Sequence, residues 1–134
     1  MLRAPGNLLV EHTTLVGFSI LLLEPNPGAA QDIRRTLEGA GAQVLPTSSC
    51  KQALLVIEKV ELSAAVLDYK ESAIDDHAIA RHLTKLGIVF LFCMDVGRDD
   101  VQPSAPVLFR PIVGEKLIGT LRGLLEGNCS RPDR

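Results

Sequence analysis

Three ionisable side chains, Glu24, Asp68 and Arg110, each follow a short apolar run of the sequence. Carboxylate oxygens can bind Mg²⁺, and an aspartate can also act as a nucleophile. A guanidinium can bind carboxylates or phosphoryl oxygens through paired N–H groups. An aspartate at the end of a strand often only caps a turn, so Asp68 alone identifies no chemistry. Whether the three residues act together depends on the elements that carry them.

The apolar runs predict five short strands buried on both faces of a sheet. Helical patterns lie between the runs and carry apolar residues on one face. Strands that alternate with helices favour right-handed crossovers and a parallel sheet covered on both faces. We therefore predict an α/β fold, a doubly wound five-stranded parallel sheet. The predicted strands cover residues 20–23, 43–46, 64–67, 88–93 and 106–109.

Four helices are predicted, and the segment before the last strand is expected to lack a full one. The first starts at Pro27, the second is capped by Ser48 or Ser49, and the third is capped by Asp75 or Asp76. The last covers residues 114–125. In the segment from Met94 to Pro106, glycine and prolines leave room for about two helical turns at most.

The chain length of 134 residues fits a single domain. We assign residues 18–126 to that domain, residues 1–17 to an N-terminal extension and residues 127–134 to a C-terminal tail. The formal net charge is −2 and no basic cluster is present, which argues against nucleic-acid or anionic-membrane partners.

Membrane insertion and disulfides are not expected. The apolar stretches at residues 8–10 and 15–23 are too short to span a bilayer. The three cysteines, Cys50, Cys93 and Cys129, form no metal-binding or disulfide pattern. We therefore predict a cytoplasmic protein from a reducing compartment.

The carboxyl ends of parallel strands are where sites form in such sheets. Here they gather Glu24, Asp68, Met94 and Arg110. In order and spacing, residues 20–125 resemble the receiver domain of bacterial response regulators. That family has an acidic pair after strand one, a phosphoacceptor Asp after strand three, a Thr or Ser after strand four and a Lys-Pro after strand five. The resemblance implies the flavodoxin-like receiver fold with strand order 2-1-3-4-5.

Matched residue by residue, the resemblance is partial. Asp68 occupies the phosphoacceptor position and Glu24 the first acidic position, so these two residues could form a weak Mg²⁺ site. Pro25 replaces the usual second acidic ligand and offers no side-chain oxygen. Met94 stands at the family's Thr/Ser position and cannot donate a hydrogen bond to a phosphoryl group. Arg110 stands at the Lys position, where it keeps the charge or can pair directly with Asp68 or Glu24.

The resemblance implies a stand-alone, atypical receiver in two-component (phosphorelay) signal transduction that is not an enzyme. We expect it to act by protein–protein contact, with weak or no phosphorylation at Asp68. The expected partner is a histidine kinase or another two-component protein, and a homodimer through the last helix is also possible. Two alternatives stay open: a conventional Mg²⁺-dependent phosphoacceptor receiver, and an α/β small-molecule-binding domain that shares only the fold.

Overall fold

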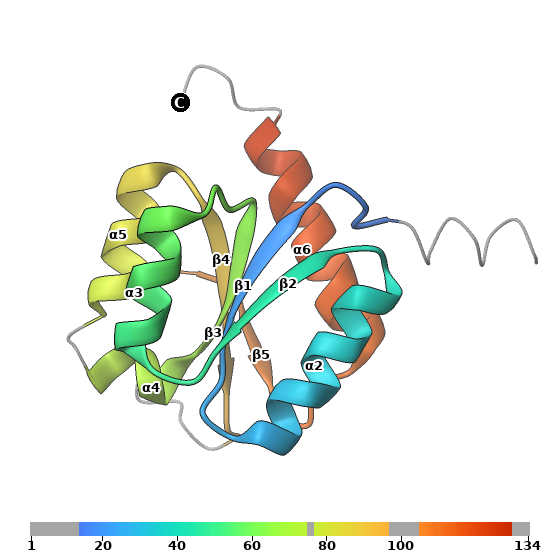
Figure 1. Ribbon diagram of the computed structural model, residues 1–134. Helices are drawn as coiled ribbons and strands as arrows, with labels where there is room; N and C mark the ends of the chain where they lie inside the picture. Colours follow the sequence, from blue (N-terminus) through green and yellow to red (C-terminus); the bar gives the residue numbers. More distant parts are fainter. Residues whose placement is uncertain (1–13, 75–76, 97–104, 130–134) are drawn as a thin grey trace, which may run out of the picture.

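A five-stranded parallel sheet forms the centre of the molecule (Figure 1). The computed structural model describes residues 14–74, 77–96 and 105–129. The strand order, β2-β1-β3-β4-β5, confirms the predicted topology. Most strand limits differ by one residue from those predicted. The strands are β1 (Ser19–Leu23), β2 (Gln43–Thr47), β3 (Ala64–Asp68), β4 (Val89–Met94) and β5 (Val107–Phe109).

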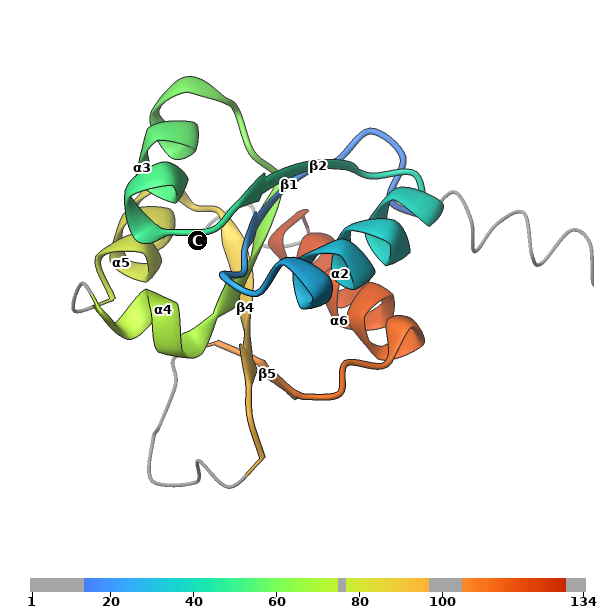
Figure 2. The same ribbon diagram turned by 60° about the horizontal axis from the view of Figure 1, so that its bottom comes forward.

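Helices cover both faces of the sheet (Figure 2). On one face lie α2 (Pro27–Gly39) and α6 (Gly114–Cys129). On the other lie α3 (Cys50–Lys59), α4 (Tyr69–Ile74) and α5 (Ala78–Leu86). Within the described ranges, no helix combines the length and apolar character that crossing a membrane requires.

The strands are apolar on both faces because each face supports a separate core. In β1, Ile20 and Leu22 pack with α2 and α6, whereas Leu21 and Leu23 pack with α3 and α5. All four side chains are fully buried. This alternation fixes the register of β1, since a shift by one residue would exchange the two faces.

The helices differ from the predictions at three places. The six-residue helix α4 starts directly after Asp68, where no helix was predicted. The N-cap of α5 is His77, in a left-handed conformation with φ of 57° and without a side-chain cap of its own, whereas the cap was predicted at Asp75 or Asp76. Those two aspartates lie outside the described residues. The last helix continues to Cys129, beyond the predicted end at residue 125.

The chain packs against the domain before β1 begins. Leu15 is fully buried in the core beside α2 and α6, and its N–H donates to the Ala40 carbonyl at 2.9 Å. Arg122 in α6 donates to the Thr14 carbonyl at 3.3 Å. Residues 1–13 lie outside the described ranges, as do residues 97–104, where the shortened helix was predicted.

Candidate functional site

Arg110 joins the ends of three strands. Its N–H donates to the Met94 carbonyl at 2.8 Å, which fixes its backbone at the end of β4. Its Nη2 then donates to Glu24 Oε1 at 2.6 Å and to Asp68 Oδ1 at 2.5 Å. β1 and β3 are neighbours, so the two carboxylates that follow them lie side by side. The predicted pairing of Arg110 is confirmed with both carboxylates.

The second oxygen of each carboxylate is bound by a local backbone N–H. Glu24 Oε2 accepts from Asn26 at 3.1 Å, and Asp68 Oδ2 accepts from Glu71 at 2.9 Å. Asn26 is also the N-cap of α2, because its Oδ1 accepts from the Ala29 N–H. The first turn of α4 likewise presents the Glu71 N–H to Asp68. All four carboxylate oxygens therefore have hydrogen-bond partners.

The site is a buried ion cluster in which carboxylates outnumber cations. Glu24 is 5% exposed and Asp68 7%, whereas the Arg110 side chain is 24% exposed. Burial alone would lower the pKa of the guanidinium, but hydrogen bonds and charge attraction from Glu24 and Asp68 outweigh it. The pKa of Arg110 is therefore above its ordinary value. A third carboxylate, the exposed Asp95, lies 3.3 Å from Arg110 Nη1.

Met94 and Cys93 form the apolar wall of the site. Met94 is 3% exposed and Cys93 is 1% exposed. Burial raises the pKa of the Cys93 thiol to about 12. The cavity beside Asp68 measures only about 20 Å³ and is lined by Asp68, Tyr69, Lys70, Cys93, Met94, Asp95 and Arg110. Such a volume holds roughly one water molecule.

The donors around Asp68 fit a Mg²⁺ ion poorly. Pro25 has no side-chain oxygen, and Asn26 Oδ1 is used to cap α2. Glu24 and Asp68 both direct an oxygen at Arg110. No group of three or more His, Cys, Asp or Glu side chains in the described ranges is placed to hold a metal ion. Mg²⁺ prefers six oxygen ligands in octahedral geometry, and this arrangement does not supply them.

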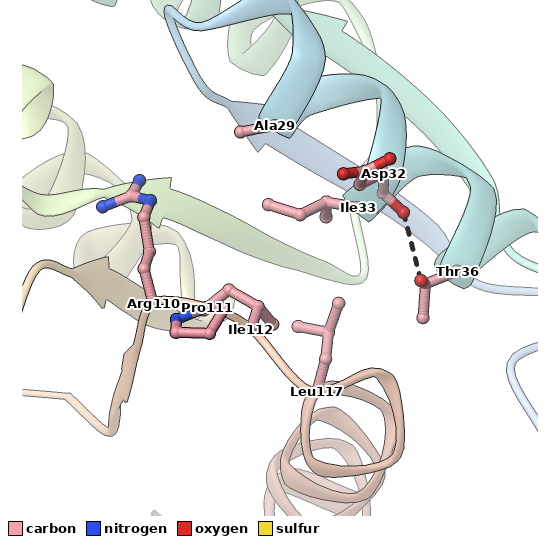
Figure 3. Close-up of a pocket in the computed structure, with 8 residues that line it drawn as sticks. All are labelled: Ala29, Asp32, Ile33, Thr36, Arg110, Pro111, Ile112 and Leu117. Carbon is pink, nitrogen blue, oxygen red and sulfur yellow. Dashed lines mark hydrogen bonds between the residues drawn. The ribbon is translucent and has the colours of Figure 1, made fainter.

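A larger cavity lies on the other side of Arg110, between α2 and α6 (Figure 3). Its volume is about 470 Å³. The Arg110 guanidinium points away from this cavity, whereas Ile33 and Leu117 point into it. The polar groups at its edge include Thr36, whose hydroxyl donates to the Asp32 carbonyl at 3.1 Å. It is lined by Ala29, Asp32, Ile33, Thr36, Arg110, Pro111, Ile112 and Leu117.

Some contributions to the site could not be predicted from the sequence. Asp95 follows β4 in a loop, and no pattern in the sequence indicates that its exposed carboxylate contacts Arg110. The backbone N–H of Glu71 was missed, because a short polar helix has no apolar period. Asn26 follows Pro25 and has a side-chain oxygen that could serve a metal ion, but that oxygen accepts from the Ala29 N–H and caps α2. The family's acceptor, first acidic, hydroxyl and Lys positions nevertheless all lie at one edge.

Comparisons with known proteins give the fold. No protein-family model matches the sequence, and no match was found among curated proteins. A response-regulator receiver-domain protein from Clostridium thermocellum superposes with a TM-score of 0.73 at 20% identity, covering 84% of this chain and 98% of that one. A response-regulator receiver protein from Sinorhizobium medicae gives a TM-score of 0.70 at 20% identity, covering 85% and 97%.

A further solved structure covers nearly the whole chain. The response regulator PhyR from Brucella abortus matches with a TM-score of 0.72 at 18% identity, and the match spans 97% of this chain and 56% of that one. These structures share with the present chain the parallel sheet and its helices. The chain therefore has the fold of response-regulator receiver domains.

Proposed function

We propose that this chain, whose fold is that of receiver domains, is an atypical receiver of two-component signalling. It acts in the cytoplasm by protein–protein contact and uses little or no phosphorylation at Asp68. One observation carries the proposal: a single guanidinium nitrogen of Arg110 binds both Glu24 and Asp68. The site thus contains its own cation.

Phosphorylation would require Asp68 to exchange these partners. The carboxylate must direct an oxygen at phosphorus, but Oδ1 is bound by Arg110 and Oδ2 by the Glu71 N–H. Displacing Arg110 would leave Glu24 and Asp68 buried with no cation between them. Leaving a buried charge without its partner costs about 3–5 kcal/mol. A Mg²⁺ ion could offset this cost only by finding ligands that the chain lacks at Pro25.

Space also argues against a bound phosphoryl group. The cavity beside Asp68 is about 20 Å³, and the buried Met94 side chain is part of its wall. Met94 has no hydroxyl to donate to a phosphoryl oxygen. A hydrogen bond to a charged group contributes roughly 1.5–3 kcal/mol, so its absence would weaken any phosphorylated state.

The surface next to Arg110 supports a role in protein contact. Phe109 is 50% exposed and Val113 is 57% exposed. They flank Pro111 and Ile112, which line the cavity between α2 and α6. We propose that a histidine kinase or another two-component protein packs against this surface. By contrast, Leu117, Leu121 and Leu125 of α6 lie in the core, so a homodimer through α6 would have to use its other residues.

The phosphorylation part is tested with acetyl phosphate and Mg²⁺, followed by intact-mass and peptide mass spectrometry. We expect no phosphate on Asp68 of the unmodified protein. Restoring the family's residues together, Pro25→Asp, Met94→Thr and Arg110→Lys, should produce a detectable acyl phosphate. A phosphate on the unmodified protein that disappears in Asp68→Asn would overturn the proposal and return the domain to conventional phosphotransfer.

The contact part is tested by affinity capture of two-component proteins from the source cell. Val113→Glu should reduce recovery of the captured kinase or regulator at least tenfold. Ile74→Glu is the matched control, because Ile74 is also an exposed aliphatic residue, at 72%, but lies on α4 on the opposite face. If the Val113→Glu and Ile74→Glu variants recover the kinase or regulator equally well, this surface is not the contact site.

The cavity in Figure 3 favours a second candidate function, the binding of an apolar small molecule. Its volume of about 470 Å³ falls within the range typical of ligand pockets, and most of its lining is apolar. Native mass spectrometry of the purified protein tests this candidate. A bound species that is lost in Ile33→Glu would favour it, and a spectrum with the mass of the chain alone would count against it.

A further inference from the structure

An apolar pocket lies at the edge of the sheet opposite Asp68. Three of its residues, Phe18, Ser63 and Ile88, immediately precede β1, β3 and β4, which places it at the amino ends of the strands. Its volume is about 450 Å³. The lining consists of Phe18, Ile57, Val60, Glu61, Leu62, Ser63, Leu86, Gly87, Ile88 and Leu125.

The two cores of the domain meet at this pocket. Phe18 and Leu125 pack with the core under α2 and α6, whereas Leu62 and Ile88 pack with the core under α3 and α5. Leu86 at the pocket is 53% exposed. Apolar side chains that fill the pocket would therefore extend both cores at once and remove exposed apolar surface from water.

The N-terminal segment begins within reach of this pocket. Thr14 is held beside α6, because its carbonyl accepts from Arg122. Phe18, which lines the pocket, donates its N–H to the Leu15 carbonyl at 3.2 Å, so Thr14 lies about one turn of chain from a lining residue. The four residues from Val10 to Thr14 can span up to about 13 Å. A side chain at position 10 or before can thus reach the pocket.

The composition of the segments outside the described ranges indicates which of them could fill this pocket. Residues 97–104 read GRDDVQPS and residues 130–134 read SRPDR, and neither contains two consecutive apolar residues. Residues 8–10, by contrast, are Leu-Leu-Val. We propose that Leu8, Leu9 and Val10 dock into the apolar pocket at the amino ends of the strands.

Because residues 8–10 belong to the same chain as the pocket, even a weak interaction is sufficient to keep the pocket occupied. A short flexible linker gives an effective concentration in the millimolar range. An interaction too weak to detect between separate molecules would then still occupy the pocket. This inference concerns the edge opposite Asp68 and does not depend on the proposed function.

The direct test is methyl NMR on the full chain labelled at Leu, Ile and Val. Docking predicts nuclear Overhauser contacts between the methyl groups of Leu8 or Leu9 and those of Ile88 or Leu125. In a sample that mixes two differently labelled populations, these contacts should be intramolecular. Contacts that are only intermolecular would identify a second copy as the occupant and overturn the proposal, as would a complete lack of contacts.

A double-mutant cycle gives an independent measurement. Leu9→Glu should lower the unfolding temperature of the full chain by about 3 °C or more, since one apolar anchor is lost. Asn7→Glu adds the same charge outside the apolar run and should leave the temperature unchanged. Leu86→Glu combined with Leu9→Glu should cost less than the two separate effects added together. Strict additivity, or equal effects of Leu9→Glu and Asn7→Glu, would overturn the proposal.

Discussion

The two edges of the sheet are stabilised by different interactions. At the carboxyl edge, one guanidinium holds two buried carboxylates, and the cavity left between the side chains has the size of one water. At the amino edge, apolar side chains and close backbone packing dominate, and an open pocket remains. The first edge is specified by charge and hydrogen-bond geometry, the second by shape. Substitutions at the two edges should therefore destabilise the domain for different physical reasons.

The largest effect is expected from Arg110→Ala. The change leaves Glu24 and Asp68 buried without their shared cation, so the free energy of unfolding should fall by about 3 kcal/mol. Denaturant titration at pH 7 measures this loss. Arg34→Ala is the matched control, because Arg34 also pairs with a glutamate but is 50% exposed. Its loss should stay below about 0.5 kcal/mol. Equal losses would show that burial adds nothing to the Arg110 cluster.

At the amino edge, Gly41→Ala adds a single methyl group and should lower the free energy of unfolding more than any other such addition. Gly41 has φ of +99°, and a Cβ there would lie 2.3 Å from Val16 Cγ2 and 3.1 Å from the Val16 backbone nitrogen. The left-handed conformation and the backbone contact together predict a loss of about 2 kcal/mol in the free energy of unfolding. Gly39→Ala, which meets no atom within 4 Å, should cause no loss. A tolerated Gly41→Ala would mean that residues 14–17 do not pack tightly on the α2–β2 turn.

The smallest effect concerns Cys93 and appears only at alkaline pH. An unfolded cysteine ionises near its ordinary pKa of 9.0, whereas the buried thiol ionises near 12. The neutral thiol therefore contributes stability fully below pH 9, and this contribution is lost as the pH rises towards 12. The loss amounts to about 1.4 kcal/mol per pH unit within that interval.

Comparing the unmodified protein with Cys93→Ala isolates this contribution from other titrating groups. Unfolding free energies measured at pH 8 and pH 10 should differ by about 1.4 kcal/mol more in the unmodified protein than in the variant. Identical pH dependence would mean that the thiol is accessible to solvent in the folded state.

The sequence predicted the sheet well because its signals are local. Short apolar runs such as that of β3 end at a charged residue, and this was enough to place Asp68 at the carboxyl edge. The pairing of Arg110 could also be anticipated, since the ends of β1, β3 and β5 meet at that edge. Whether Arg110 pairs with one carboxylate or with both depends on interatomic distances that no sequence pattern encodes.

The failures have physical causes too. The helix α4 consists of YKESAI, which is too short and too polar to show a helical period. The left-handed conformation of His77 at the start of α5 could not be predicted, because a positive φ at a histidine has no pattern in the sequence. The homodimer through α6 stays a prediction, but the sequence pattern could not show that Leu117, Leu121 and Leu125 are used in the core. In each case the neighbours in space decided the outcome.

The covalent attachment of Arg110 has a consequence for how information could pass through this domain under the proposed function. A metal ion or phosphoryl donor is supplied by the solution, so its occupancy reports the state of the cell. Arg110 is part of the chain, so every molecule carries the cation that binds Glu24 and Asp68. A domain of this kind has no adjustable input at its site. Under the proposed function, a change of signalling state would then have to come from the protein partner at the neighbouring surface and not from ligand occupancy at Asp68.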